Sequence, residues 1–169
     1  MEDNFVYVGK IVNTHGIKGE VRILSNFEFK DKVFVPNMKI YVGRKKEEEI
    51  IETYRHHKNF EMITMKGYSN INEVLKYKGL YVYVKKNDLN LLEDEYFDSD
   101  LINLNVIVDN NMVGTVKDIR TTGKNNKILE VDTNSKIVLI PYQKEFIKKI
   151  NITNKEIVLK PIKGMFEWE

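Results

Sequence analysis

The segment VGKIVNTHGIKGEVRI near the N-terminus places a histidine and two glycines between two apolar runs. An imidazole can act as a general acid or base, but it needs a nucleophile or an orienting carboxylate beside it. The residues around His15 match neither a GxSxG nucleophile elbow nor an HExxH zinc motif, and the chain has no cysteine. The pattern therefore favours a structural or binding role for His15 over a catalytic one.

Two glycines of this segment, Gly16 and Gly19, have a spacing that could serve a phosphate-binding loop. Such a loop normally opens a helix, whereas the residues that follow here, EVRIL, alternate as in a β-strand. The GxxG spacing also resembles the RNA-binding loop of KH domains, but that loop joins helices. We therefore expect Gly16 and Gly19 to supply a positive φ in a turn between strands, with Gly9 as a further structural glycine of the turn.

The composition excludes several classes of protein. Without cysteine there can be no disulfide, no thiolate nucleophile and no cysteine-ligated metal. No apolar run reaches the roughly 18 residues that a membrane-spanning helix requires, and the start lacks the features of a signal peptide. We expect a cytoplasmic protein that has no metal, no cofactor and no membrane association.

The charge is nearly balanced, with 27 basic and 25 acidic residues and a net charge of +2. A dedicated nucleic-acid reader usually has a clear basic excess, and only 4 of the 27 basic residues are arginine. Sequence-specific reading of a duplex is therefore unfavoured. Contact with RNA phosphates through lysine is compatible with this composition.

Short runs rich in β-branched and aromatic residues dominate the first half and predict strands. They cover residues 5–12, 20–24, 38–42, 49–54, 60–65 and 80–84. One helix is predicted between them, with Asn70 and Glu73 as a capping box and Gly79 as its stop. Six strands with one short helix predict a small closed barrel, since closure removes exposed sheet edges.

The acidic stretch KKNDLNLLEDEYFDSD interrupts this pattern and predicts a linker before a second β-rich half. In that half, strands are expected at residues 104–108, 112–119, 128–131, 137–140 and 156–160. Residues 109–111 predict a hairpin turn, and residues 143–150 predict one or two amphipathic helical turns. We expect a mainly β chain with two small β-barrels and few short helices, divided into domains 1–86 and 97–169 by the linker 87–96.

Tyr96 and Phe97 form an aromatic pair inside the acidic stretch. Aromatic side chains are preferred anchors of protein interfaces, and the surrounding carboxylates would favour a basic partner. Alternatively, both rings pack between the two domains. The sequence leaves these two readings open.

Several stretches together resemble the ribosome maturation factor RimM family. VGKIVNTHGIKGEVRI is similar to the N-terminal signature of that family, in the order Gly9, His15-Gly16 and Gly19 to Arg22. EYFDSDLINLNVIV, VGTVKDIRTTGKNNKILEV and VLIPYQKEFIKKINITNKEIVL resemble its PRC-barrel domain. Asn103 stands where many members have glycine, and asparagine tolerates a left-handed backbone better than most residues.

The resemblance implies a non-enzymatic assembly factor with a six-stranded N-terminal barrel and a second small β-barrel. It implies binding to the free small ribosomal subunit, contact with protein number nineteen of the subunit head, possible contact with rRNA, and action as a monomer. By the same resemblance Tyr96 and Phe97 bind the ribosome, and His15, Lys18 and Arg22 are expected to bind a partner. The rival functions are an RNA-processing or RNA-modifying enzyme and a generic PRC-barrel adaptor.

Overall fold

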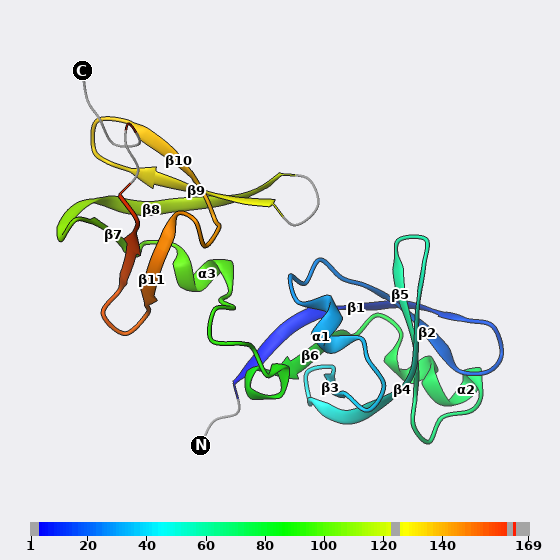
Figure 1. Ribbon diagram of the computed structural model, residues 1–169. Helices are drawn as coiled ribbons and strands as arrows, with labels where there is room; N and C mark the ends of the chain where they lie inside the picture. Colours follow the sequence, from blue (N-terminus) through cyan, green and yellow to red (C-terminus); the bar gives the residue numbers. More distant parts are fainter. Residues whose placement is uncertain (1–3, 123–125, 162–163, 165–169) are drawn as a thin grey trace. The chain divides into compact units, whose positions relative to one another are not determined.

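The chain folds into two compact units, residues Met1–Asp94 and Glu95–Glu169 (Figure 1). The computed structural model describes residues 4–122, 126–161 and 164. Residues 123–125, which belong to one of the stretches that resemble the PRC barrel, lie outside the described residues, as does most of the chain after residue 161. Both units are built mainly from strands joined by a few short helices, which confirms the predicted fold class.

The first unit is a closed barrel of six strands in the order β1-β2-β5-β4-β3-β6, and all neighbouring strands are antiparallel. This confirms the predicted barrel. The strands are β1 (Phe5–His15), β2 (Glu20–Leu24), β3 (Lys39–Val42), β4 (Glu47–His57), β5 (Phe60–Met65) and β6 (Tyr81–Lys85). Both β1 and β4 are longer than their apolar runs, so His15 is the last residue of a strand rather than part of a loop.

Alternation along the strands builds the interior of the barrel, because successive side chains of a strand point to opposite faces. The inward positions of five strands are fully buried. They include Val8, Ile11, Val21, Ile23, Ile40, Val42, Ile51, Val82 and Val84. The outward positions of β1 and β6 carry tyrosine and lysine instead.

Short helices and turns connect the strands of the first unit. They are α1 (Lys30–Val33), α2 (Ile71–Val74), η1 (Leu75–Tyr77) and η2 (Lys86–Leu89). At α2 the predicted capping box is confirmed, because the Asn70 side chain accepts from the Glu73 amide and the Glu73 side chain accepts from the Asn70 amide. None of the helices in the described part of the chain is long and apolar enough to cross a membrane.

Gly9 corrects one expectation, because it lies inside β1 and not in a turn. The ladder between β1 and β6 shifts register between Tyr7 and Gly9, as at a β-bulge. A Cβ atom on Gly9 would lie 2.6 Å from the backbone carbonyl oxygen of Leu24. Glycine is therefore needed here for the close approach of two strands rather than for a positive φ.

The second unit contains a six-stranded sheet in the order β10-β9-β8-β7-β12-β11. Its strands, preceded by α3 (Asp98–Leu101), are β7 (Asn105–Val108), β8 (Asn111–Thr122), β9 (Asn126–Asp132), β10 (Ile137–Pro141), β11 (Ile147–Asn151) and β12 (Glu156–Leu159). The pair β7 and β12 is parallel, and the other pairs are antiparallel. A buried cluster that includes Leu101, Leu129 and Ile157 forms the core of this unit.

Local turn chemistry in the second unit follows the predictions. Asp109 and Asn110 both adopt a positive φ, of 49° and 65°, in the hairpin between β7 and β8. Asn103 adopts a φ of 71°, the left-handed conformation that asparagine tolerates.

The boundary between the two units lies after Asp94. The residues expected as a linker, 87–96, begin inside η2, where Leu89 is buried.

The helical expectation for residues 143–150 is wrong from Ile147 onward. These residues form β11, which pairs with β12 in an antiparallel ladder. Phe146, Ile147 and Ile150 pack against the core cluster at a spacing typical of a helix face, and a register shift between Ile147 and Lys149 accommodates this spacing in the strand. The ladder with β12 decides between the two, and no local sequence signal reports that contact.

Candidate functional site

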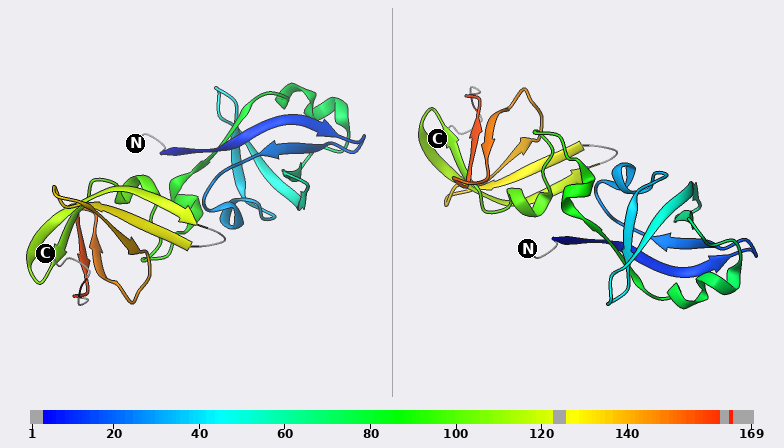
Figure 2. Two further views of the ribbon diagram at one scale, coloured as in Figure 1. Left: turned by 90° about the horizontal axis from the view of Figure 1, so that it is seen from above. Right: turned by 90° about the horizontal axis from the view of Figure 1, so that it is seen from below.

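The HGIKG segment lies at the turn between β1 and β2, the two blue strands of Figure 2. His15 lies opposite Glu20 in the ladder between these strands. Gly16 and Gly19 have φ values of 68° and 91°, as expected for the glycines of this turn. The Ile71 amide donates to the Ile17 carbonyl oxygen at 2.9 Å, so the turn is attached to the start of α2. A loop held in this way presents its side chains from a rigid scaffold, which is a usual arrangement for binding residues.

The tip of the turn exposes an apolar side chain beside a lysine. Ile17 is 78% exposed, and Lys18 is exposed without an ion-pair partner in the part of the chain that the structure describes. Beside them lies a surface pocket of about 350 Å³. It is lined by His15, Gly16, Ile17, Lys18, Glu20 and Thr64. The sequence analysis did not identify Ile17 as a candidate contact residue. A large apolar residue between two turn glycines is the signal that could have identified it.

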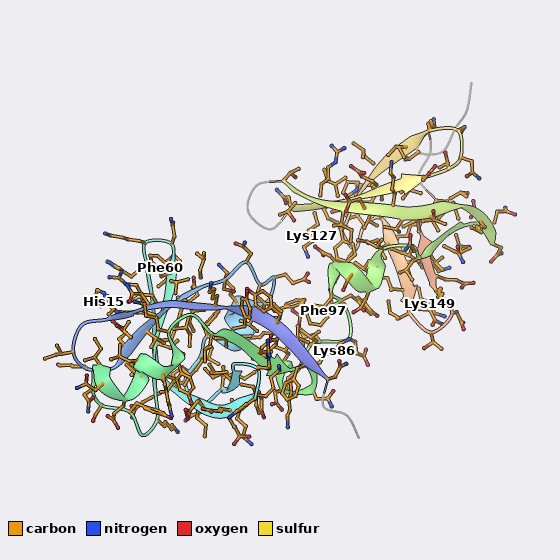
Figure 3. All side chains as sticks on the ribbon, turned by 180° about the vertical axis from the view of Figure 1, so that it is seen from behind. His15, Phe60, Lys86, Phe97, Lys127 and Lys149 are labelled. Atoms are coloured by element: carbon orange, nitrogen blue, oxygen red, sulfur yellow. The ribbon has the colours of Figure 1, made fainter. Side chains whose placement is uncertain are left out.

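Arg22 holds the His15 ring in place. Its Nη2 atom lies 2.6 Å from Nδ1 of His15, and its guanidinium lies 5.7 Å from the centre of the Phe60 ring, at the end of the barrel where Figure 3 labels His15 and Phe60. Because a guanidinium has only donors, Nδ1 of His15 must accept and the proton of the neutral ring lies on Nε2. Arg22 is half-buried, and its Nε is buried without a hydrogen-bond partner among the described residues. Arg22 therefore positions His15.

Arg55 and Glu20 add an ion pair that the sequence did not predict. The Nε and Nη2 atoms of Arg55 each donate to one oxygen of Glu20 at 2.8 Å, a bidentate geometry. The hydrogen bond from Arg55 lowers the pKa of Glu20 below its ordinary value. The two residues are 35 positions apart and meet only because β5 lies between β2 and β4. The ion pair thus links β2 and β4 across β5, next to the turn.

The histidines of β4 point to different surroundings, as predicted for neighbours in a strand. The His57 ring centre lies 6.2 Å from that of His15, whereas His56 contacts Glu61. Partial burial and the positive charge of Arg55 lower the pKa of His57 below its ordinary value.

The hydrogen bond of the His15 ring is to the cationic Arg22 and not to a carboxylate of the kind that orients the histidine of a Ser-His-Asp triad. Among the described residues no group of three or more histidines and carboxylates could hold a metal ion. The exposed Ile17 and Lys18, beside a fixed imidazole, are groups that can contact a partner.

A buried carboxylate on β5, that of Glu61, contacts side chains of β4 and α1. Glu61 is 2% exposed; it accepts from the Tyr54 hydroxyl at 2.7 Å, lies 2.9 Å from Nδ1 of His56, and lies 3.7 Å from Nζ of Lys30. Burial alone would raise the pKa of Glu61, but these partners together hold it below its ordinary value. Burial and the bond to Glu61 raise the pKa of Tyr54 to about 12.

Replacing Glu61 by glutamine is expected to lower the stability at neutral pH by about 1–3 kcal/mol. The depressed pKa also fixes the pH dependence: the contribution of Glu61 is present above its unfolded pKa of about 4.3 and is lost as the pH falls through its folded pKa. Melting curves between neutral pH and pH 3 should therefore fall less steeply with acid in Glu61→Gln. The exposed Glu52 gives the control Glu52→Gln. Identical acid slopes in wild type and Glu61→Gln would contradict this role.

Tyr96 and Phe97 lie immediately before α3, where Phe97 is the N-cap residue. Phe97 is only 8% exposed, and Tyr96 is half-buried and packs against the core cluster of the second unit. In the acidic stretch, Asp98 pairs with Lys127 at 2.7 Å. The structure thus gives Phe97 a buried place, while part of Tyr96 reaches the surface.

Comparison with known proteins covers both units. Residues 6–89 match the RimM N-terminal domain, and residues 98–165 match the RimM PRC barrel domain. The chain is 42% identical over 167 residues to the ribosome maturation factor RimM of Staphylococcus haemolyticus, which covers 96% of this chain and 99% of that protein. It is 38% identical over 170 residues to the protein of the same name from an Exiguobacterium species, covering 98% and 99%. The chain therefore belongs to the RimM family.

Proposed function

We propose that this chain is a non-enzymatic assembly factor that binds the free small ribosomal subunit and assists the maturation of its head and the processing of its rRNA. Membership of the RimM family carries this proposal, because relatives that match along nearly the whole chain are named ribosome maturation factors. Family membership supports a role in ribosome maturation.

The turn at the end of the first barrel supports a binding function. Its tip exposes Ile17 and Lys18, its glycines have the φ values that a tight turn requires, and Arg22 fixes His15 beside the pocket. In the proposed complex Ile17 and Lys18 contact the partner directly, and Arg22 acts through His15.

The second unit is proposed to contact a head protein, number nineteen of the small subunit. Tyr96 would supply the aromatic contact. The carboxylates near it in sequence would favour a basic ribosomal protein during encounter. We further propose that the chain acts as a monomer in the cytoplasm.

Replacing Ile17 and Lys18 together by alanine is expected to weaken binding to isolated small subunits about tenfold. An apolar anchor and a charge at an interface typically contribute that much, at about 1.4 kcal/mol per decade. Fluorescence anisotropy of the labelled chain, titrated with purified subunits, measures the affinity. Leu92→Ala with Lys148→Ala is the matched control, since it also removes an exposed apolar side chain and an exposed lysine. Equal affinities of the loop variant and the control would contradict the role of the turn.

The absence of catalysis is tested separately. Purified wild-type chain incubated with precursor rRNA should neither cleave nor modify it, with or without divalent metal ions. Cleavage or modification that is lost in His15→Ala would favour the rival reading as an RNA-processing enzyme.

A further inference from the structure

A second surface of the first unit carries groups that the proposed function does not use. On the outer side of β1, β6 and β3, Tyr7 lies opposite Tyr83, and Tyr83 lies opposite Tyr41. One step along the same strands, Lys10 lies opposite Tyr81. Four of the nine tyrosines of the chain are thus on one sheet face. Tyr41 is only 4% exposed, so its ring is not part of the accessible surface. We name this surface the tyrosine–lysine face and define it by Tyr7, Lys10, Lys46, Tyr81 and Tyr83.

The rings of this face contact one another edge to face and remain partly exposed. Tyr7 contacts Tyr81 and Tyr83 edge to face, with ring centres 5.6 Å and 6.0 Å apart. Edge-to-face contact leaves ring faces uncovered, and Tyr7 and Tyr81 are 53% and 50% exposed. Pairing across strands stabilises a sheet, but it does not require half of each ring to remain in water.

Lysines lie among these rings. Nζ of Lys46 is 4.0 Å from the centre of the Tyr83 ring, and Nζ of Lys10 is 5.8 Å from that of Tyr81. Neither lysine has an ion-pair partner in the described part of the chain. A carboxylate stands at the border of the face, where Glu48 accepts from the Tyr41 hydroxyl at 3.3 Å. The centre of the face therefore combines exposed aromatic rings with positive charge.

We propose that the tyrosine–lysine face binds single-stranded RNA, with bases stacked on Tyr7 and Tyr81 and phosphates near Lys10 and Lys46. Alternating ring faces and cations are the arrangement by which proteins hold unpaired nucleotides. Such stacking is tolerant of sequence, so it does not need arginine, of which this chain has only 4 residues. Lysines between the rings would repel a basic ribosomal protein and attract a phosphate backbone. The inference rests on the proposed function, since rRNA is the RNA that a subunit assembly factor meets.

The test is the affinity of the full chain for fluorescein-labelled twelve-nucleotide oligo(U) and oligo(A), measured by anisotropy at low salt. Each ring removed should weaken binding about fivefold or more, so Tyr7→Ala with Tyr81→Ala should weaken it about 25-fold. Tyr7→Phe with Tyr81→Phe keeps the rings and should bind within about twofold of wild type. Melting curves of both variants check that the fold is kept. If the alanine pair unfolds, Tyr7→Phe with Tyr81→Phe still tests the proposal, because a large loss of affinity in that folded pair would contradict stacking on the rings.

The lysines are tested by the dependence of that affinity on salt. Lys10→Gln with Lys46→Gln should flatten the slope of log affinity against log salt by about 0.7 for each phosphate that the variant no longer neutralises. Lys148→Gln with Lys149→Gln removes the same charge from exposed positions of β11 and should leave the slope unchanged. Equal slopes in the two charge variants would overturn the assignment of phosphate binding to Lys10 and Lys46.

The failure of this inference can be told from the failure of the proposed function. If wild-type chain binds small subunits while the folded alanine pair binds the oligonucleotides as wild type does, the RNA assignment alone is wrong. If the alanine pair loses subunit affinity but keeps its oligonucleotide affinity, the occupant of the face is a protein. If the oligonucleotide affinity depends on the tyrosines but the chain does not bind subunits, the proposed function fails and the RNA surface stands.

Discussion

Replacing Gly9 by alanine is expected to lower the free energy of unfolding of the first unit by about 3 kcal/mol, at the upper end of the usual range for overpacking. The new Cβ would lie 2.6 Å from the Leu24 carbonyl oxygen, and a backbone atom cannot move aside as the end of a side chain can. The contact joins β1 to the chain at the end of β2, so relief would require opening the barrel. Urea unfolding followed by circular dichroism measures the decrease.

Gly16 provides the matched control for this prediction. Its φ of 68° is left-handed, and a Cβ there would meet nothing within 4 Å. Gly16→Asn should therefore stay within about 1 kcal/mol of wild type, because asparagine tolerates that conformation. A Gly9→Ala variant that unfolds at the same urea concentration as Gly16→Asn would show that β1 and β2 are less tightly joined than the structure indicates.

Replacing Phe97 by alanine is expected to lower stability by about 3–5 kcal/mol, the usual range for a buried phenylalanine. The residue is 8% exposed and occupies the N-cap position of α3 without a side-chain hydrogen bond to the helix. Tyr96→Ala should behave differently, because that ring is half-buried: we expect a stability decrease of about 1–2 kcal/mol. Its affinity for the small subunit should fall about tenfold, as for a central interface anchor.

Both variants are to be measured by a melting curve and a binding isotherm on the same preparation. Tyr96→Phe is the conservative control, since it keeps the ring and removes only the hydroxyl. The proposed interface predicts that folded Tyr96→Ala binds weakly, and that salt reduces the contribution of the surrounding carboxylates to encounter. A large drop in melting temperature of Tyr96→Ala with unchanged affinity would refute the interface role and leave Tyr96 as a structural residue.

Much of the fold follows from local sequence signals. The capping box of Asn70 and Glu73, the hairpin at Asp109 and Asn110, and the alternating runs of the first barrel each depend on residues close in sequence. Such signals act through neighbouring backbone groups, so they can be read without knowing the rest of the chain. The six strands of the first unit were found for that reason.

The predictions from sequence are wrong or incomplete where contacts between segments far apart in the sequence determine the local structure. Residues Ile147–Asn151 became a strand because β12 pairs with them, and the four-residue helices α1 and α3 carry too few residues for a periodic pattern. The extension of β1 to His15 likewise depends on its ladder with β2. Gly9 was expected in a turn, whereas the need for glycine comes from the approach of Leu24, 15 residues later.

The sequence motif identified residues that the structure places close together, but not their contacts with distant segments. His15, Lys18 and Arg22 were selected from one motif, and the structure brings His15 and Arg22 into contact and exposes Lys18. The roles differ within that set, since Arg22 holds His15 and is itself half-buried. Arg55 could not be found, because it reaches Glu20 only through the order of strands in the closed barrel.

The most direct measurement of the central claim is sedimentation of the tagged chain with cell extract through a sucrose gradient that separates free subunits from full ribosomes. Wild-type chain is expected to travel with free small subunits and to be absent from full ribosomes. The variant Ile17→Ala with Lys18→Ala is expected to shift toward the top of the gradient while retaining its melting temperature. Folded wild-type chain that stays at the top, or that travels equally with full ribosomes, would contradict a role in assembly of the small subunit.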